Sequence, residues 1–330
     1  MNLKELPKIE LHCHLDGSIR PKTVLELALK QGLPLPSYEV NYIKNILIAP
    51  IECNSLKEYL ERFEIPIKLM QSKENLRRIA FELMEDSAKE NIKYIEIRFA
   101  PLLHTASDLS IEDIIKSVLD GINDGEKKYD IKGNLILSFL RHMPVKTIYE
   151  VLEIGKKYLN NGIVAVDLCA NEEHGFSKKF IKPFSLAKEL GYRITVHAGE
   201  TGIGENVLEA IETLGAERIG HGIYINSCKE AYDIVKDKNI VLEICPTSNV
   251  QTKAVNSIET HPLLNFYKDN LKVTINTDNR TVSNTTLTNE YTIIKNTFNI
   301  DFNIYKNFYF NSIDAAFIDD KFKLKLKNLI

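Results

Sequence analysis

The sequence is poor in cysteine and contains no long apolar run, and both absences exclude classes of protein. The 330 residues include 5 cysteines, which form no C-x-x-C pair and are odd in number. This pattern argues against a disulfide framework and against a thiolate zinc site. Three of them, Cys13, Cys169 and Cys245, lie in strand-like runs, where we expect buried thiols that act as small hydrophobic side chains.

No window approaches the ~18–20 apolar residues that span a bilayer, and the N-terminal MNLKELPKIE lacks the apolar core of a signal peptide. We therefore predict a soluble, cytoplasmic protein without a membrane partner. Lysine plus arginine number 42 and aspartate plus glutamate 45, with no basic block of the kind that neutralises phosphate backbones. Nucleic acid is not expected as a partner, and nothing in the sequence implies a protein partner.

Short runs rich in β-forming residues alternate with helical patterns along the chain. Such alternation predicts a parallel sheet, and eight repeats predict that it closes into a TIM (β/α)8 barrel, an α/β fold. The alternative is an open doubly wound sheet, but no G-x-G-x-x-G follows the first strand, which removes its commonest dinucleotide-binding version. The predicted strands are 9–15, 94–99, 135–140, 163–168, 193–198, 218–221, 240–245 and 272–277.

We expect one domain, residues 1–330, with a helical insertion at 33–93 between the first two strands. The insertion holds helical segments around 55–71 and 74–90, and in a barrel it would lie over the C-terminal mouth as a lid. The tail from about 285 holds two more helical patterns and ends in KFKLKLKNLI, whose alternating lysines predict a solvated edge. The other predicted helices are 21–30, 111–129, 146–160, 178–190, 205–214, 228–238 and 262–270.

Side chains that could bind a metal gather at the C-terminal ends of the predicted strands. His12 and His14 are two apart in the first strand, so they share a face. Barrel active sites lie at this end of the strands, so we predict that the strand-end residues meet there. The fifth, sixth and eighth strands end in HAGE, GHG and NTDN, which supply His197, Glu200, His221, Asp278 and Asn279.

Three imidazoles and one carboxylate suit a divalent ion such as Zn²⁺, which lowers the pKa of a bound water toward ~7. The pattern leaves open which histidine stands apart, because there are five candidates, His12, His14, His197, His221 and Asp278. Two-metal barrels of this kind generally need a lysine at the end of the fourth strand, and here that strand ends VDLCANE. We therefore predict one metal ion per chain.

The motifs LPKIELHCHLDGSIRP, YIEIRFAP, VDL, HAGE, IGHG, CPTSNVQT and NTDN follow one another along the chain. In this order they resemble the adenosine deaminase family of the amidohydrolase superfamily, over essentially the whole sequence. The resemblance implies zinc-dependent hydrolytic deamination of adenosine, and of 2′-deoxyadenosine, to inosine plus ammonia in purine salvage. The expected partner is therefore a small purine nucleoside. The resemblance also implies that His12, His14, His197 and Asp278 bind zinc, that Glu200 is the proton donor and that His221 orients the hydroxide.

The chemistry accounts for these residue types. Water attacks an aromatic carbon only if the charge that builds on the ring is neutralised, and Glu200 can give a proton to ring nitrogen 1 if a closed site raises its pKa. The alternative for Glu200 is a carboxylate stabilised by the dipole of the helix that follows. Asp278 can bind metal and accept the water's proton. His221 either shares in that transfer or stabilises the hydroxide electrostatically, and both roles stay open.

The residues expected to contact the substrate are His14, Asp16, Ala170 and Asn279. Asp16, in HLDG, suits a hydrogen bond to a ribose hydroxyl, whereas adenine deaminases resemble HLEG and a nucleotide-acting branch HLNG; the alternative is a turn-capping residue. Asn279 stands where many members carry Asp, and its amide can donate to purine nitrogen 7 at any pH. Ala170 replaces the usual glycine, whose backbone N–H meets nitrogen 3, and its methyl narrows the pocket.

Two other functions remain as alternatives. Adenine or another aminopurine could be deaminated at the same site, and a non-catalytic purine-binding barrel would share the fold. The metal ligands, the proton donor and the histidine that would orient the hydroxide are all present, which argues against the non-catalytic alternative. A zinc enzyme of the cytidine deaminase type is disfavoured because the chain has neither H-x-E nor P-C-x-x-C.

Overall fold

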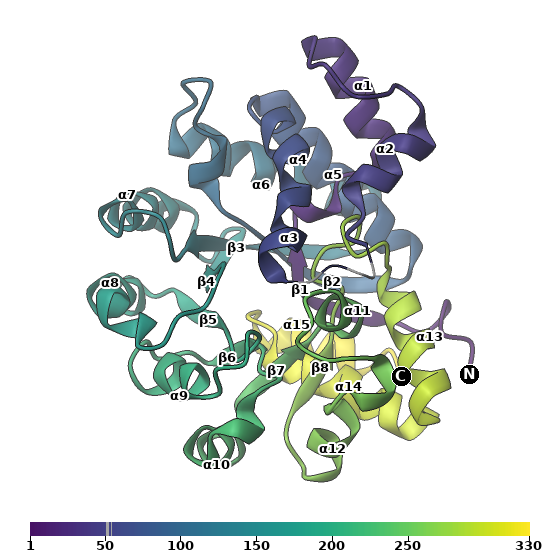
Figure 1. Cartoon of the computed structure of the whole chain (residues 1–330), viewed down its shortest axis with the longest axis vertical. Coiled ribbons are helices and arrows are strands. Elements are labelled where there is room, and N and C mark those ends of the chain that lie inside the picture. The colour runs from purple at the N-terminus through teal and green to yellow at the C-terminus, as the bar shows by residue number, and fades with distance from the viewer. Residues whose placement is uncertain (51–52, 54) are drawn as a thin grey trace.

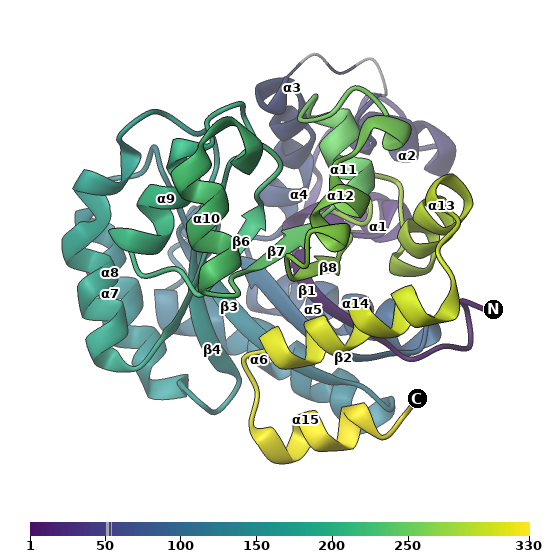
Figure 2. The same cartoon turned by 90° about the horizontal axis from the view of Figure 1, so that it is seen from below.

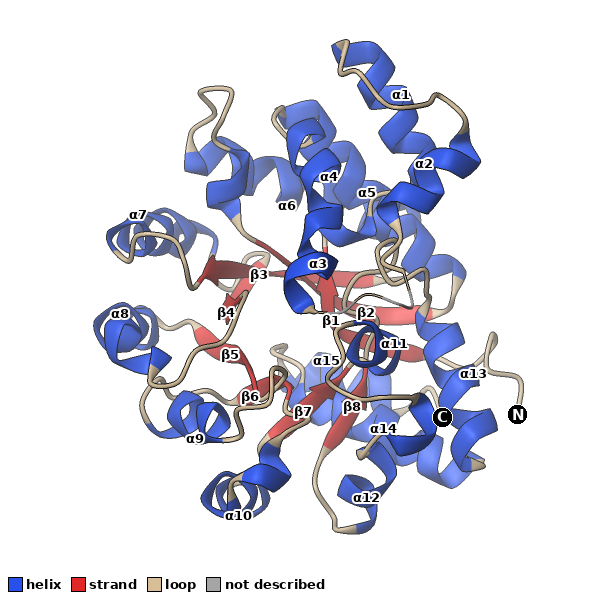
Figure 3. Ribbon diagram, in the orientation of Figure 1, coloured by secondary structure: helices blue, strands red, loops and turns tan. Residues whose placement is uncertain are grey.

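Eight parallel strands follow one another around the sheet in chain order, with helices surrounding them (Figures 1 and 3). The structure, a computed structural model, describes residues 1–50, 53 and 55–330. The strands are β1 (Lys8–His14), β2 (Ile92–Phe99), β3 (Lys132–Leu140), β4 (Ile163–Cys169), β5 (Arg193–Ala198), β6 (Arg218–His221), β7 (Val241–Ile244) and β8 (Val273–Ile275).

The first and last strands meet just beyond the end of β8. Cys13 pairs in parallel with Asp278, the His14 N–H donates to the Asp278 carbonyl at 2.7 Å, and the Asp278 N–H donates to the His12 carbonyl at 2.9 Å. These contacts close the sheet into the predicted (β/α)8 barrel and exclude the open doubly wound alternative.

The strands are buried on both faces, as is typical of a parallel sheet between layers of helices. Every residue of β4 is buried, and the five cysteines are all free and buried, as expected for Cys13, Cys169 and Cys245. Strand β8 is shorter than the predicted 272–277. It ends at Ile275 because Asn276 reaches β1 with its side chain, whose Oδ1 accepts from the Leu11 N–H at 3.0 Å.

Local sequence signals set the helix ends. Pro21 begins α1 (Pro21–Gln31), and Gly32 ends it at φ 65°, with its N–H near the Ala28 and Leu29 carbonyls. The predicted helix 146–160 ends at Gly155, because a 3-10 turn follows. Helix α5 (Lys73–Lys89) precedes β2, and the helices between the later strands are α6 (Ile111–Lys128), α7 (Lys146–Gly155), α8 (Ile181–Leu190), α9 (Glu205–Glu212), α10 (Lys229–Asp237), α11 (Pro246–Gln251) and α12 (Leu263–Lys268).

The segment between β1 and β2 divides into two parts. Helix α5 packs against α6 and β2 in the barrel wall, whereas α3 (Leu56–Leu60) and α4 (Glu64–Leu69) lie at the C-terminal end of the strands, with α3 over the centre of the barrel in Figure 1. Helix α2 (Val40–Leu47) was not predicted, because its eight residues bury only Ile43 and Leu47. Residues 51, 52 and 54 of the predicted insertion 33–93 lie outside the described residues.

The tail contains three helices rather than the predicted two: α13 (Leu287–Phe298), α14 (Phe302–Ala315) and α15 (Asp320–Lys327). The segment KFKLKLKNLI, expected to be a solvated edge, lies largely in α15, which Asp319 caps through the Phe322 N–H, and only Leu326 of that helix is buried. Figure 2 shows α15 at the end of the molecule opposite α3. Among the described residues, every helix is too short or too polar to cross a membrane.

Candidate active site

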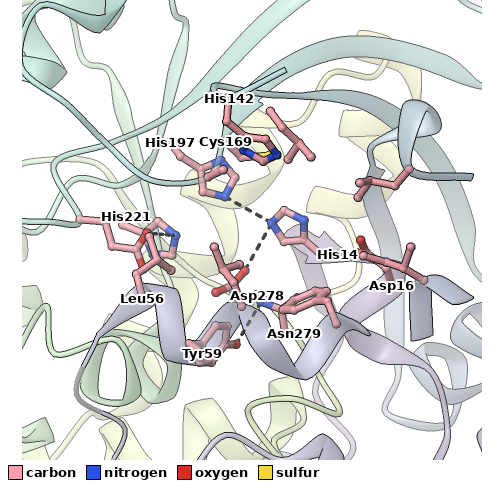
Figure 4. Close-up of a pocket in the computed structure, with 17 residues that line it drawn as sticks. His14, Asp16, Leu56, Tyr59, His142, Cys169, His197, His221, Asp278 and Asn279 are labelled. Carbon is pink, nitrogen blue, oxygen red and sulfur yellow. Dashed lines mark hydrogen bonds and ion pairs between the residues drawn. The ribbon is translucent and has the colours of Figure 1, made fainter. Parts of the chain in front are cut away.

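A cavity of about 280 Å³ lies at the C-terminal ends of the strands (Figure 4). Apolar side chains of α3 and the residues after it, such as Leu56, Leu60 and Phe63, form one side, and strand-end residues form the other. His12 is fully buried and lies against His197, with ring centroids 4.6 Å apart. The structure therefore brings every predicted site residue to one place. Those that line the cavity are His14, Asp16, Ala170, His197, Glu200, His221, Asp278 and Asn279.

Four buried side chains form a group that could hold a metal ion. One ligand atom from each of His12, His197, His221 and Asp278 lies within 4.8 Å of the others. His14 is not a member of that group, but it lies beside two of its members, with its Nε2 3.2 Å from His197 Nε2 and 3.4 Å from Asp278 Oδ1. All five candidates therefore converge, and proximity alone does not separate the implied ligand His14 from His221.

Two carboxylates that the sequence analysis missed accept hydrogen bonds from the Nδ1 atoms of two of these histidines. Glu243 Oε2 accepts from His12 Nδ1 at 2.8 Å, and Asp167 Oδ1 accepts from His197 Nδ1 at 2.9 Å. Such partners fix a ring so that Nε2 is free to bind a metal. Among the described residues, His12 Nε2 forms no hydrogen bond of good geometry, and it lies 3.4 Å from Asp278 Oδ1. The sequence did contain a signal for these two residues. Asp167 and Glu243 are each the only charged residue in an otherwise apolar strand, and a buried charge needs a partner.

Arginines inside the barrel keep these carboxylates charged. Arg98 Nη2 lies 2.8 Å from Glu243 Oε2, and Arg218 Nε lies 2.7 Å from Glu243 Oε1. Burial alone would raise the pKa of Glu243, but the two guanidinium groups and His12 hold it well below its usual range. Burial lowers the pKa of His12 to about 4, so the ring is neutral, as a metal ligand must be.

Asp278 is held in place by its backbone and by a serine. It adopts φ 60°, a left-handed conformation that turns the chain sharply out of the barrel, and Ser248 Oγ donates to its Oδ2 at 2.6 Å. Burial opposes ionisation of Asp278, but the adjacent His12, whose Nε2 lies 3.4 Å from Asp278 Oδ1, and the neighbouring His14 and His221 hold the pKa of that carboxyl well below its usual range. Asp278 therefore supplies negative charge to the group of imidazoles.

Glu200 sits in a loop fixed by a second glutamate. Glu172 Oε1 accepts from the Glu200 N–H at 2.7 Å, and Glu172 Oε2 accepts from the Gly199 N–H at 2.9 Å and from Asn206 Nδ2 at 2.8 Å. Burial raises the pKa of Glu200, which favours the protonated form that an acid needs. Its Oε2 lies 3.7 Å from His221 Nε2. The sequence analysis did not identify Glu172.

The residues expected to bind substrate lie around the same cavity. Asp16 is buried, its Oδ1 accepts from the Gly17 N–H at 3.2 Å, and burial raises its pKa to about 6. A Cβ on Gly17 would lie 1.9 Å from Asn279 Oδ1, so only glycine fits there. Asn279 Nδ2 donates to the hydroxyl of Tyr59 at 3.0 Å, and that hydroxyl lies 2.7 Å from Ser283 Oγ. The sequence analysis did not single out Tyr59.

Comparisons with known proteins agree with this geometry. A family model described as adenosine deaminase matches residues 7–330. A relative in Clostridium botulinum (strain 657 / Type Ba4) named adenosine deaminase is 57% identical over 330 residues, which covers 100% of both chains. Another of that name, in Clostridium perfringens (strain 13 / Type A), is 56% identical over 327 residues, covering 99% of this chain and 98% of the relative.

Solved structures of several deaminases share the fold. An adenine deaminase from Arthrobacter aurescens has a TM-score of 0.91 at 25% identity, covering 98% of both chains. An arabidopsis N6-mAMP deaminase has a TM-score of 0.88 at 28% identity, covering 99% of this chain and 98% of the other. Arabidopsis ADAL complexed with IMP also has a TM-score of 0.88 at 28% identity, covering 99% and 96%.

Proposed function

Because this chain belongs to the adenosine deaminase family, whose members are hydrolases that act on C–N bonds, we propose that it removes the exocyclic amine of adenosine and of 2′-deoxyadenosine. Water replaces the amine, and the products are inosine, or its 2′-deoxy form, plus ammonia. The observation that supports the proposal is the buried cluster of imidazoles around Asp278, with Glu200 in the same cavity.

The residues fit one zinc ion per chain. Imidazoles and a carboxylate suit a borderline divalent cation, and the buried His12 Nε2, which forms no hydrogen bond of good geometry among the described residues, offers such a cation a ligand atom 3.4 Å from Asp278 Oδ1. We propose His12, His14, His197 and Asp278 as the ligands. When bound, such an ion lowers the pKa of a water molecule to near neutrality.

The chain's own residues then divide the proton transfers. Asp278, whose pKa is held well below its usual range chiefly by His12 and which is therefore ionised, accepts the proton that the attacking water releases. Glu200, whose pKa burial raises, gives a proton to purine nitrogen 1, so that negative charge does not build on the ring. Asn279 donates to nitrogen 7, the Ala170 N–H to nitrogen 3, and Asp16 accepts from a ribose hydroxyl.

The proposal is tested by supplying the purified protein with Zn²⁺ and following absorbance and ammonia release with adenosine, 2′-deoxyadenosine, adenine and AMP. We expect turnover of the two nucleosides, loss of turnover on chelation, and repulsion of the 5′-phosphate of AMP by Asp16. Glu200→Gln should keep the metal and lose several orders of magnitude in rate, because only proton donation is removed.

Each alternative has its own outcome. Faster turnover of adenine would favour the adenine deaminase alternative, and purine binding without ammonia release would favour the non-catalytic one. An active preparation free of metal would overturn the zinc site. Purine salvage in the cytoplasm belongs to the same proposal, and growth of a purine auxotroph on adenosine, together with cell fractionation, would test it.

A further inference from the structure

A series of hydrogen bonds begins at Nδ1 of His221, the ring nitrogen on the side away from Glu200, and continues through Asn249 to His261. His221 Nδ1 lies 3.0 Å from Asn249 Nδ2, Asn249 Oδ1 lies 3.2 Å from His261 Nε2, and His261 Nδ1 lies 3.1 Å from the Leu263 N–H. All three side chains are buried, with 1%, 0% and 3% of His221, Asn249 and His261 exposed.

The backbone N–H of Leu263, at the end of this series, fixes which atom donates in each of the other hydrogen bonds. A backbone N–H can only donate, so His261 Nδ1 must accept from Leu263. Burial lowers the pKa of His261 to about 3, so the ring is neutral and carries its single proton on Nε2. That proton is donated to Asn249 Oδ1. The amide group of Asn249 therefore turns its NH₂ toward His221 Nδ1.

His221 then differs from the two histidines beside it. His12 and His197 each donate a hydrogen bond from Nδ1 to a carboxylate, so the ring proton is on Nδ1 and Nε2 carries none. His221 meets a donor at Nδ1 instead, so its proton is on Nε2, the nitrogen that lies 3.7 Å from Glu200 Oε2. The three neighbouring rings are thus held in two opposite tautomers.

We propose that Asn249 and His261 are positioning residues that hold His221 as the neutral tautomer with its proton on Nε2. In this state Nε2 can donate a hydrogen bond to the attacking oxygen, but it can neither remove a proton nor bind a metal. The catalytic consequence rests on the proposed function, in which His14 rather than His221 completes the ligand set. The tautomer itself is a property of the folded chain and needs no turnover.

The direct test is long-range ¹H–¹⁵N NMR on the zinc-loaded protein labelled with ¹⁵N in histidine, with the His221 signals assigned through His221→Gln. A nitrogen without a proton resonates well downfield of one that carries a proton. We expect Nδ1 of His221 in the downfield position and Nε2 in the upfield position. The reverse pattern, or a charged ring with both nitrogens protonated, would overturn the proposal whether or not the protein deaminates adenosine.

Variants separate positioning from structural support. Asn249→Asp replaces the donor with an acceptor, so Nδ1 of His221 should become protonated in the same spectrum. His261→Phe keeps an aromatic ring but frees the Asn249 amide to rotate, and it should give mixed tautomers and lower kcat by roughly tenfold with little change in KM. His261→Gln retains a donor toward Asn249 and should restore the parent spectrum and most of kcat.

The neighbouring Thr260 provides a matched control. It is exposed, and its hydroxyl accepts from the Ser257 N–H at 3.3 Å and donates to the Ser257 carbonyl at 3.1 Å. Thr260→Ala should leave the His221 spectrum and kcat unchanged. An equal loss of kcat in Thr260→Ala and His261→Phe, with parent-like His221 signals in both, would show that His261 only supports the loop.

Discussion

At the scale of single residues, three site residues adopt left-handed backbone conformations. Ala170, His221 and Asp278 have φ values of 73°, 64° and 60°. This region disfavours a Cβ by roughly 1–2 kcal/mol, so non-glycine residues occupy it only where the surrounding structure holds them there. For His221 and Asp278 the side chain itself is needed at the cavity. For Ala170 only the backbone N–H has a proposed role.

Ala170→Gly should therefore be tolerated. Relief of the left-handed strain and the greater freedom of glycine in the unfolded chain act in opposite directions, so the free energy of unfolding should change by less than about 1 kcal/mol. Removing the methyl should lower KM for adenosine. Denaturant titration and steady-state kinetics check both expectations. A rise in KM would contradict the view that the methyl narrows the purine site.

Asp16 provides a second prediction at this scale. Asp16→Asn should weaken adenosine binding by roughly 1–3 kcal/mol, because a buried charged hydrogen bond to ribose is lost, and should affect adenine much less. Since burial raises the pKa of Asp16 to about 6, binding of adenosine by the parent should also weaken as the pH falls below that value. Inhibition constants for the two ligands measure both effects. Equal losses would leave Asp16 as a cap for the Gly17 N–H.

At the scale of elements, the hydroxyl of Tyr59 on α3 forms hydrogen bonds with residues that follow β8. Tyr59, fully buried on α3, accepts from Asn279 Nδ2 and contacts Ser283. This contact uses one of the two amide hydrogens of Asn279 and leaves the other for purine nitrogen 7. The helix over the cavity and the residue proposed to bind the base are therefore positioned together.

Tyr59→Phe should raise KM for adenosine roughly three- to tenfold, as expected for one lost hydrogen bond, and should hardly affect 7-deazaadenosine, which lacks the acceptor. Asn279→Ala should show the same preference between substrates. The double variant should lose no more than Asn279→Ala alone if Tyr59 acts through Asn279. Additive losses, or equal losses on both substrates, would mean that Tyr59 supports α3 only.

The contact between α11 and α13 contains a buried carboxyl whose charge depends on pH. Glu290 on α13 accepts from the Thr247 N–H of α11 at 3.1 Å, and burial raises its pKa from 4.5 to about 7. Between these two values the folded chain binds more protons than the unfolded chain. The free energy of unfolding that this group contributes therefore falls as the pH rises from about 4.5 to about 7.

Glu290→Gln keeps the shape and removes the titration. Relative to the parent, the variant should gain stability as the pH rises from 5 to 8, by at most roughly 3 kcal/mol. Denaturant unfolding of both zinc-loaded proteins across this range measures the difference. A difference that does not vary with pH would show that Glu290 is ionised in the fold at all these values.

At the scale of the whole molecule, the proposed metal ligands join β1, β5 and β8, and the last of these meets the first where the barrel closes. The opposite end is closed by the tail. The Phe317 N–H donates to Glu96 Oε1 at 2.6 Å, and its ring lies 3.8 Å from the Arg218 guanidinium carbon. Hydrogen bonds therefore hold both ends, and the proposed metal would add a further link at the end where the first and last strands meet.

Removing the metal should destabilise the fold as a whole. A ligand present at about 1,000 times its Kd stabilises the folded state by roughly 4 kcal/mol, so chelation should lower Tm by several degrees. His12→Ala should abolish the difference between metal-free and metal-loaded protein. His142→Ala, at a histidine that lines the cavity outside the cluster, should retain it. Equal Tm values for the parent with and without zinc would contradict the site.

The sequence by itself determined the barrel and the meeting of its strand-end residues. Alternating strands and helices leave few topologies, and in a closed parallel barrel all C-terminal strand ends share one face. His12, His197 and Asp278 could therefore be brought together without knowing any contact between them. The short helices α2 and α15 were not predicted, because α2 buries only Ile43 and Leu47 and α15 only Leu326, too few apolar positions to show a helical repeat.

Only the tertiary structure showed which side chains form hydrogen bonds with the histidines of the site. Glu243 holds His12 from 231 positions away, and Asn249 reaches His221 from 28 positions away. These pairs join different strands and loops, so no local spacing or period encodes them. A hydrogen bond has a direction and a reach of about 3 Å, and the protonation of each ring depends on its partner atom. The residue types in the sequence predict a metal site, but the tautomer of each histidine in it depends on contacts that form only when the chain has folded.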